Sequence, residues 1–263
     1  MFSILILYLA SPSVPTILDI IIPLNESRDR IYLYQTEYFV DQDEYYIPIL
    51  IHAYMTVPIS VSVLVFLDNM FAMYIHHACG MFAILGSHLE VLHMSNNNEN
   101  LLDKAIRSRR IHSEIVRCAN IHCNAIDFAN ELESSYAVAY LLMFSVNLSM
   151  ITVTGIVTVM KLNQPSEMVK FLAFTVGEIF HVFFSCFQGQ ELIQQSGNIF
   201  EAAYNSEWYK IPVRDRNLLI PIMVRSMKPC AVTAGKLYPI SMGTFSVVLK
   251  NAMSFFTVLS SMR

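Results

Sequence analysis

Long apolar stretches separated by polar segments constrain this chain more than any other feature of its sequence. A helix needs about 20 mostly apolar residues to cross ~30 Å of hydrocarbon. Five stretches of about that length or more cover residues 3–22, 45–75, 136–160, 168–187 and 239–262. Pro12 and Pro15 interrupt the first. We interpret it as a kinked span because it lacks the basic start of a signal peptide, which is the alternative. The chain is therefore predicted to be an all-α, polytopic transmembrane helix bundle of about five spans.

Composition supports this class and excludes others. The chain is 54% hydrophobic and only 14% charged, against roughly 25% charged residues in soluble domains. Its formal net charge is -4 and it has no basic tract, so we expect no nucleic-acid partner. The five cysteines lack the paired spacing of a disulfide framework or a zinc ribbon. We expect them to be free thiols.

Lysines and arginines predict the orientation, because these residues are retained on the cytoplasmic side. They gather in segments 93–135 and 188–238, whereas 23–44 is mainly acidic and 161–167 is short. The amino terminus is therefore predicted to be cytoplasmic and the carboxyl terminus extracellular. A glycosylation sequon at Asn25 agrees, because it lies in the predicted outer loop. A second sequon at Asn147 falls inside a span.

The cytoplasmic segments also have helical character. Apolar residues recur among the charges of 101–135, and Leu192, Ile199 and Ala203 repeat at nearly helical spacing in 188–210. We expect helices to continue past the bilayer and to meet in a cytoplasmic bundle.

No cluster in the sequence predicts catalysis or a cofactor. His76, His77 and Cys79 form one group, and Cys118, His122 and Cys123 form another, but neither has the histidine spacing of a membrane di-iron site. Nucleophile-elbow, phosphate-loop and dinucleotide-binding patterns are also missing from the sequence. We therefore expect no metal, no cofactor and no enzymatic activity.

Ionisable residues inside spans are costly and should face protein or water. Asp68 lies near the inner end of the second span, where an interfacial position and a structural partner are equally compatible with the sequence. Glu178 and His181 share one face of the fourth span and predict a cavity or an interhelical contact. Lys250 in the fifth span would repel cations, so we expect it to contact a neighbouring helix or to extend its charge toward the interface.

The outer halves of two spans offer a set of side chains for an apolar ligand pocket. These are Met55, Ile59, Phe171 and Phe174. Ordinary helix packing is the alternative for each of them.

Two blocks of sequence carry a family resemblance. Around residues 38–90 stand EYFVDQDEYYIPILIH and HHACGMFAILGSHLE, and residues 186–212 and 218–263 contain CFQGQELIQQSGNIFEAAYNSEWYKIP and LLIPIMVRSMKPCAVTAGKLYPISMGTFSVVLKNAMSFFTVLSSMR. These resemble the insect odorant receptor family. Its recurring positions match Gly189, Ser196, Tyr204, Trp208, Tyr209, Pro212, Gly235, Phe245, Phe256 and Thr257.

The resemblance implies a heteromeric, tetrameric, ligand-gated cation channel built with a co-receptor subunit. It implies a cytoplasmic anchor from segments 101–135, 188–210 and 215–230, a last helix that lines the pore, and a hydrophobic gate at Val258 and Met262 that closes by dewetting. It also places Met55, Ile59, Phe171 and Phe174 in the odorant cavity. Family members have seven spans, so residues 1–263 would form one receptor-type domain that holds helices three to seven. Lys250 does not fit a cation pathway, because its positive charge would repel cations.

The sequence thus predicts an odorant-sensing subunit in the plasma membrane of olfactory sensory neurons. A volatile ligand would bind the open state more tightly than the closed state and shift the population toward it. A secondary transporter is one alternative, although we find no internal repeat of spans. A G-protein-coupled chemoreceptor is another, although the cytoplasmic amino terminus disfavours it. A truncated product that cannot conduct by itself is the third.

Overall fold

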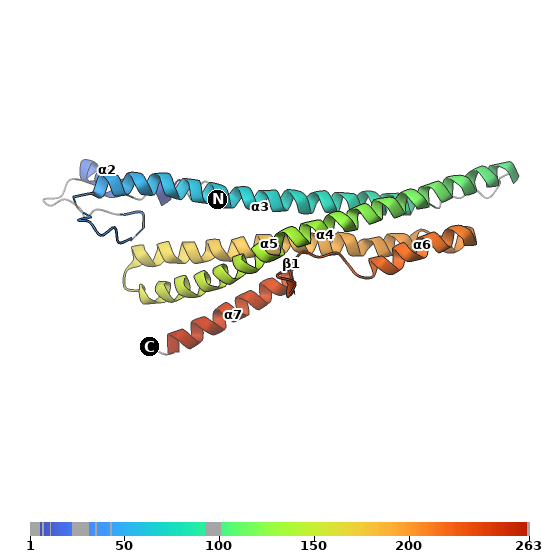
Figure 1. The fold of residues 1–263 in the computed structure, drawn as a ribbon. Coiled ribbons are helices and arrows are strands. Elements are labelled where there is room, and N and C mark those ends of the chain that lie inside the picture. The colour runs from blue at the N-terminus through green and yellow to red at the C-terminus, as the bar shows by residue number, and fades with distance from the viewer. Residues whose placement is uncertain are drawn as a thin grey trace. The chain divides into compact units, whose positions relative to one another are not determined.

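The chain consists of two compact units, Met1–Met70 and Phe71–Arg263. The computed structural model describes residues 6, 8–10, 12–22, 32–34, 36–42, 44–92 and 101–261. Helices make up most of the described residues of each unit (Figure 1).

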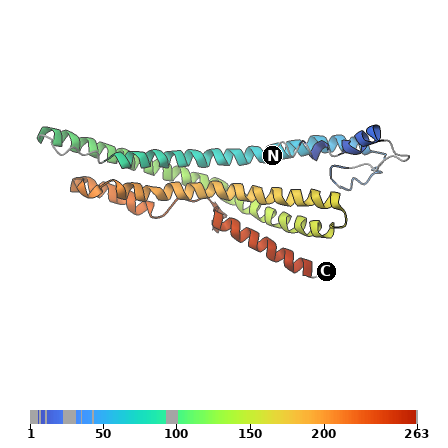
Figure 2. The same cartoon turned by 180° about the vertical axis from the view of Figure 1, so that it is seen from behind.

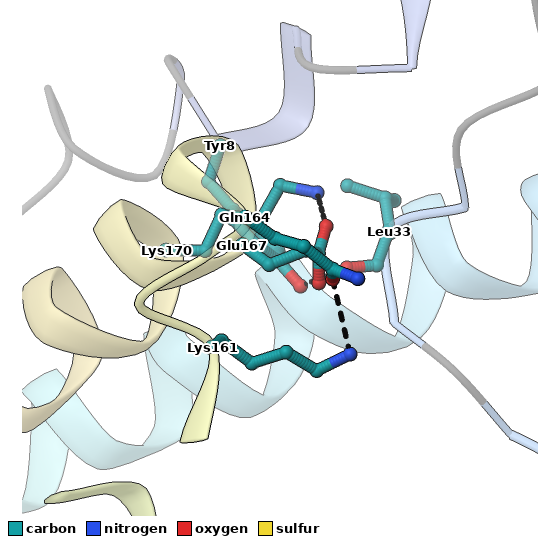
Figure 3. Close-up of polar contacts among 6 residues, drawn as sticks. All are labelled: Tyr8, Leu33, Lys161, Gln164, Glu167 and Lys170. Carbon is teal, nitrogen blue, oxygen red and sulfur yellow. Dashed lines mark hydrogen bonds and ion pairs between the residues drawn. The ribbon is translucent and has the colours of Figure 1, made fainter. Parts of the chain in front are cut away.

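The first unit contains α2, Ser13–Ile21, and the first part of α3, Tyr46–Val91. Tyrosine hydroxyls link its segments. Tyr54 donates to the carbonyl of Leu9 at 2.9 Å, and Tyr8 donates to the carbonyl of Leu33, as Figure 3 shows. Asn25 and parts of the predicted span 3–22 lie outside the described residues.

In the second unit, two long helices form an antiparallel pair. Helix α4, Leu101–Met160, and helix α5, Pro165–Asn205, lie side by side and are joined by a short turn (Figures 1 and 2). Proline is favoured at the first position of a helix such as α5, because the N–H that it lacks would have no acceptor within the helix. Around the turn, Lys161 donates to Gln164 at 3.1 Å, and Lys170 pairs with Glu167 at 2.9 Å (Figure 3).

Shorter elements follow α5. A 3-10 turn, η1, covers Trp208–Lys210 and precedes α6, Val213–Ser226. Strands β1, Thr233–Ala234, and β2, Tyr238–Pro239, pair antiparallel, with Ala234 opposite Tyr238. Helix α7, Met242–Ser261, then runs toward the end of the unit at which α4 turns into α5 (Figures 1 and 2).

The core of the second unit follows the three-and-four spacing of apolar residues on its helices. Phe82, Leu85 and Leu89 of α3 are fully or almost fully buried, as are Ile115 of α4 and Leu192 of α5. All five of these residues lie outside the predicted spans. The helices therefore pack together beyond the apolar windows, as expected for 101–135 and 188–210.

Within the part of the chain that the structure describes, four helices are long and apolar enough to cross a membrane: 46–90, 106–160, 167–205 and 242–259. They contain nearly all of the four later predicted spans, so the all-α transmembrane fold is confirmed. Two details differ from the prediction. Helix α3 continues to Val91, and α7 begins at Met242 because Pro239 belongs to β2.

Candidate functional site

Helix α5 passes very close to Ile240, the residue that follows β2. A Cβ placed on Gly189 would lie 2.2 Å from the carbonyl oxygen of Ile240. Such a distance is far inside van der Waals contact, so only glycine lets the two backbones approach this closely. Beside this point, the rings of Phe183 and Phe245 meet edge to face with centroids 5.5 Å apart. Helix α5 is thereby tied to the start of α7.

The turn between β1 and β2 rests on α4. Gly235 has φ +62°, a left-handed conformation that favours glycine, and its N–H donates to the carbonyl of Ala137 at 2.8 Å. A Cβ on Gly235 would lie 2.6 Å from Cδ2 of Leu141. The hydroxyl of Thr233 donates to the Oε1 atom of Glu133 at 2.7 Å. The turn that leads into α7 is therefore fixed to α4.

Ser196 of α5 holds the segment between α6 and β1. Its hydroxyl accepts the N–H of Cys230 at 2.9 Å and donates to the carbonyl of Leu192 at 2.7 Å. Both Ser196 and Cys230 are buried, and burial raises the pKa of the Cys230 thiol. The thiol is thus protonated at neutral pH and a poor nucleophile, so Cys230 has a structural rather than a reactive environment.

We expect Ser196→Ala to lower the free energy of unfolding by about 1–2 kcal/mol, because the buried N–H of Cys230 loses its acceptor. The midpoint of thermal unfolding of the purified protein in detergent measures the effect. Ser134→Ala is the matched control, since Ser134 is exposed and its hydroxyl only donates to Glu131 within α4. Equal melting temperatures for the two variants would contradict the prediction.

Two histidines of α4 contact α6. The Nδ1 atom of His112 lies 2.8 Å from the Oδ1 atom of Asp215, whose side chain is 3% exposed. One end of α6 is thus held by a buried carboxylate, which must have a hydrogen-bond partner to be tolerated. At the other end, the Nε2 atom of His122 lies 3.4 Å from the hydroxyl of Ser226.

Buried and half-buried polar contacts also join α4 to α5 inside the apolar windows. Asn147 donates to the Nδ1 atom of His181 at 3.3 Å, and the hydroxyl of Thr175 donates to that of Thr154 at 2.8 Å. The predicted interhelical contact for His181 is therefore present. Asn147 is buried and faces α5. Such contacts stabilise helix pairs in lipid, where unsatisfied polar groups are costly.

Helix α7 has two different sides. Val248 and Ala252 are buried. Phe256 lies against Gly155 of α4, and a Cβ placed on Gly155 would lie 3.6 Å from the Cδ2 atom of Phe256. Val258 and Lys250 are exposed, and the hydroxyl of the exposed Thr257 donates to the carbonyl of Ser254. Met262 lies outside the described residues. The exposed side of α7 is available to contact lipid, another chain or water.

The remaining family positions surround η1. Trp208 is half-buried and packs against the core, Tyr204 and Tyr209 are exposed, and Pro212 precedes the first residue of α6. Arg216 donates to the backbone carbonyls of Tyr209 and Ile211. These bonds fix the connection between α5 and α6.

The four predicted pocket residues fall in different units. Met55 and Ile59 of α3 belong to the first unit and are 64% and 63% exposed. Phe171 and Phe174 of α5 belong to the second unit, where Phe171 is half-buried and Phe174 is exposed. Their assignment to a common pocket stays a prediction.

The sequence interpretation missed two contacts of this site. The sequon at Asn147 gives no indication of this contact, although an amide inside a span is itself a signal for an interhelical contact. Nothing in the local sequence distinguishes Asp215, because it stands between Arg214 and Arg216 in a segment with the composition of an exposed charged surface. Among the described residues, no three or more histidine, cysteine or acidic side chains are placed to hold a metal ion.

Comparisons with known proteins give a consistent result. A family model described as 7tm Odorant receptor matches residues 1–253. Odorant receptor 13a of Drosophila melanogaster is 26% identical over a region that covers 74% of this chain and 48% of that protein. Odorant receptor Or2 of Anopheles gambiae is also 26% identical, with 57% and 39% covered. The chain spans about half or less of the length of these relatives.

Solved structures resemble the fold. The insect olfactory receptor OR5 from Machilis hrabei, in complex with eugenol, superposes with a TM-score of 0.75 at 13% identity, covering 97% of this chain and 62% of that one. The structure of OR5 that is described without eugenol gives a TM-score of 0.72 at 15% identity, covering 100% and 65%.

Proposed function

The chain belongs to the odorant receptor family, and from this premise we propose that it is an odorant receptor subunit that gates a cation channel. It is a multi-pass membrane protein, and its relatives are receptors rather than enzymes. The proposed ligands are small, volatile and apolar. The proposed partner is a co-receptor subunit that completes a non-selective, tetrameric cation channel.

One observation carries the proposal of gating: α5 connects the candidate pocket to the candidate pore helix. Phe171 and Phe174 lie near its amino-terminal end, and Phe183 and Gly189 contact Phe245 and Ile240 at the start of α7. A helix transmits displacement along its axis, because its hydrogen bonds keep it stiff. A ligand that moves the first part of α5 would therefore act on the start of α7.

The gate follows from the exposed side of α7. In the proposed channel, Val258 and Met262 of this chain and their counterparts in neighbouring subunits form an apolar ring. Such a ring closes a pore by excluding water, and a small widening rehydrates it. The ligand opens the pore to the extent that it binds the open state more tightly than the closed state. Lys250 is exposed on the same helix, and a cation pathway requires its charge to point away from the ring.

The proposed setting is the plasma membrane of olfactory sensory neurons, with the amino terminus cytoplasmic and the carboxyl terminus extracellular. Segments 101–135, 188–210 and 215–230 would then form the cytoplasmic anchor through which subunits assemble. The packing of α4, α5 and α6 beyond the apolar windows supports this assignment. Asn25 would be the glycosylated residue of the outer loop.

Whole-cell recording tests the proposed function. The full chain is co-expressed with a co-receptor subunit and exposed to a panel of volatile compounds. We expect odour-evoked, cation-selective currents from the pair. Phe174→Ala should shift the half-maximal odorant concentration upward about tenfold, because a lost aromatic contact costs on the order of 1.4 kcal/mol. Phe180→Ala is the matched control, since this exposed phenylalanine of α5 lies outside the predicted pocket.

The outcomes separate the proposed function from its alternatives. Absence of any evoked current while the protein reaches the cell surface would overturn the channel proposal. Tags at both ends and protease access in intact cells test the orientation, and an exposed amino terminus would contradict it. Equal shifts from Phe174→Ala and Phe180→Ala would remove Phe174 from the pocket.

A further inference from the structure

Helix α7 is apolar enough to cross a membrane over 242–259, yet polar side chains follow one of its sides. All of them are exposed, and they follow one another at spacings of three or four residues. This spacing keeps them on a single side of the helix. We name the set the polar stripe of α7, and its members are Ser246, Lys250, Ser254, Thr257 and Ser261.

The polar stripe faces away from the rest of the chain. Val248 and Ala252 are the buried residues of α7. Each is two residues from Lys250, and a helix turns about 100° per residue, so both lie nearly opposite it. Lipid, another chain or water must therefore cover the stripe.

The hydroxyls of the stripe are compatible with any of these surroundings. Ser246 donates to the carbonyl of Met242 at 3.2 Å, and Thr257 donates to the carbonyl of Ser254 at 2.8 Å. A hydroxyl that bonds to its own helix in this way is satisfied even in lipid. The lysine therefore decides what covers the stripe.

Lys250 lies near the middle of the apolar window. It is eight residues from Met242 and nine from Leu259, the ends of that window. About 12 Å of helix thus separates its backbone from the nearer end. The four-carbon stem of a lysine is too short to carry its ammonium group over that distance.

No carboxylate of this chain neutralises Lys250 in the region that the structure covers. Helix α7 contains no acidic residue, and none of the residues described makes an ion pair with Lys250. A charge inside a span faces a partner or a water-filled cavity, because hydrocarbon does not solvate it. A carboxylate of another chain would account for the lysine alone, whereas water accounts for the whole polar stripe.

We propose that the polar stripe of α7 faces the water-filled pathway of the channel and that Lys250 limits the passage of cations through it. The inference rests on the proposed function. Lys250 is eight residues from Val258, or about 12 Å along the axis, so its charge lies outside the apolar ring but on the same pathway. A fixed positive charge lowers the local concentration of cations.

The number of these charges follows from the composition of the channel. A pore made only of this chain would carry one lysine per copy at the same level of the pathway. A partner subunit without a cation at this level lowers the repulsion. The charge of Lys250 therefore favours a heteromeric pore over a pore made of identical copies.

Thiol labelling tests whether the stripe meets water. Lys250→Cys and Ser254→Cys are made in the full chain, with Cys123→Ser to remove the native exposed thiol, and expressed with a co-receptor subunit. A charged, membrane-impermeant methanethiosulfonate reagent should label both positions, because thiolates form where water reaches the sulfur. Phe255→Cys is the matched control and should stay unlabelled, since Phe255 is exposed but lies off the stripe.

Single-channel recording of odour-evoked currents tests the charge. Lys250→Gln should raise the sodium conductance about twofold, because the repulsion of cations is removed. The permeability to calcium relative to sodium should also rise, since repulsion is twice as large for a divalent ion. Surface biotinylation confirms that the variant reaches the membrane.

Moving the charge tests the side of the helix. Lys250→Gln with Ser254→Lys keeps a lysine on the polar stripe and should return the conductance to the native value. Lys250→Gln with Asn251→Lys has the same net charge, but residue 251 is exposed and rotated by about 100° from residue 250. This second variant should keep the raised conductance.

The outcomes distinguish the inference from the proposed function. Odour-evoked currents that Lys250→Gln leaves unchanged would overturn the inference and keep the function. Equal labelling of Lys250→Cys and Phe255→Cys, or equal recovery in the two relocation variants, would also overturn it. Absence of evoked current from the native pair would instead overturn the proposed function, and the labelling would still decide whether the stripe meets water.

Discussion

Gly189→Ala is expected to disrupt the junction between α5 and α7 and to abolish surface expression or lower the melting temperature strongly. The added Cβ would lie 2.2 Å from the carbonyl oxygen and 2.9 Å from the carbonyl carbon of Ile240. Both atoms belong to the backbone, and the next residue, Ser241, immediately precedes α7. They cannot rotate away as a flexible side chain does, so the two elements must separate.

One effect of Gly189→Ala favours the variant, but its contribution to the free energy of unfolding is small. Alanine is a better helix former than glycine by about 1 kcal/mol, which favours the variant. Overpacking costs about 1–3 kcal/mol in ordinary cores and more where backbone must move. We therefore expect a net loss of about 2 kcal/mol or more. Because Gly189 connects α5 to the start of α7, protein that still folds should also lose coupling between ligand and current.

The matched controls lie on the same helix. A Cβ on Gly197 would meet only the Cγ atom of Pro229 at 3.6 Å, and one on Gly177 would meet nothing within 4 Å. Gly197→Ala and Gly177→Ala should therefore keep or slightly raise the melting temperature in detergent, measured by fluorescence-detected size exclusion after heating. A Gly189→Ala protein as stable as these two would show that α5 and Ile240 are farther apart than the structure places them.

The long helices were predictable because their signal is repeated over many residues. Apolar windows fixed four of the membrane-crossing stretches, and the spacing of Leu192, Ile199 and Ala203 indicated that α5 continues beyond its window. Gly189 and Gly235 were identified only as recurring family positions. The physical reason at Gly189 is a backbone contact with Ile240, which is distant in the sequence. At Gly235 the reasons are a positive φ in a turn and the packing of that turn against Leu141 of α4.

The remaining features of the fold and the site could not be predicted, because the sequence around each of them contains too little information. Strands β1 and β2 have two residues each, which is too short for an alternating pattern to be recognised. The contact between Asn147 and His181 joins positions 34 residues apart, and no spacing rule within one helix relates them. The sequence around Asp215 has the composition of a solvated surface, yet the side chain is buried because α4 covers it.

Removing His112 from its pair with Asp215 is the second change that we expect to lower the stability of the protein strongly. The two side chains are separated by 103 residues in the chain and meet at 2.8 Å. A carboxylate only accepts hydrogen bonds, so the Nδ1 atom of His112 is the donor. His112→Leu would leave the carboxylate buried without this donor. We expect the free energy of unfolding to fall by about 2–3 kcal/mol, less than for a fully buried pair because His112 is 38% exposed.

A second pair of a histidine and a carboxylate in the same region serves as the comparison. It tests whether the burial of the carboxylate, rather than the closeness of the two side chains, determines the loss of stability. His88 and Glu114 lie 3.7 Å apart, and their side chains are 29% and 37% exposed, so water can solvate the glutamate when the histidine is removed. His88→Leu should therefore cost less than about 1 kcal/mol. The double variant His112→Leu with Asp215→Leu should recover part of the loss, because it removes the buried charge as well as its partner. Thermal unfolding of the four proteins in detergent measures these differences. If His112→Leu costs no more than His88→Leu, or if the double variant recovers nothing, then the buried carboxylate of Asp215 does not depend on His112. In that case the other contacts between α4 and α6, including the one between His122 and Ser226, hold α6 in place.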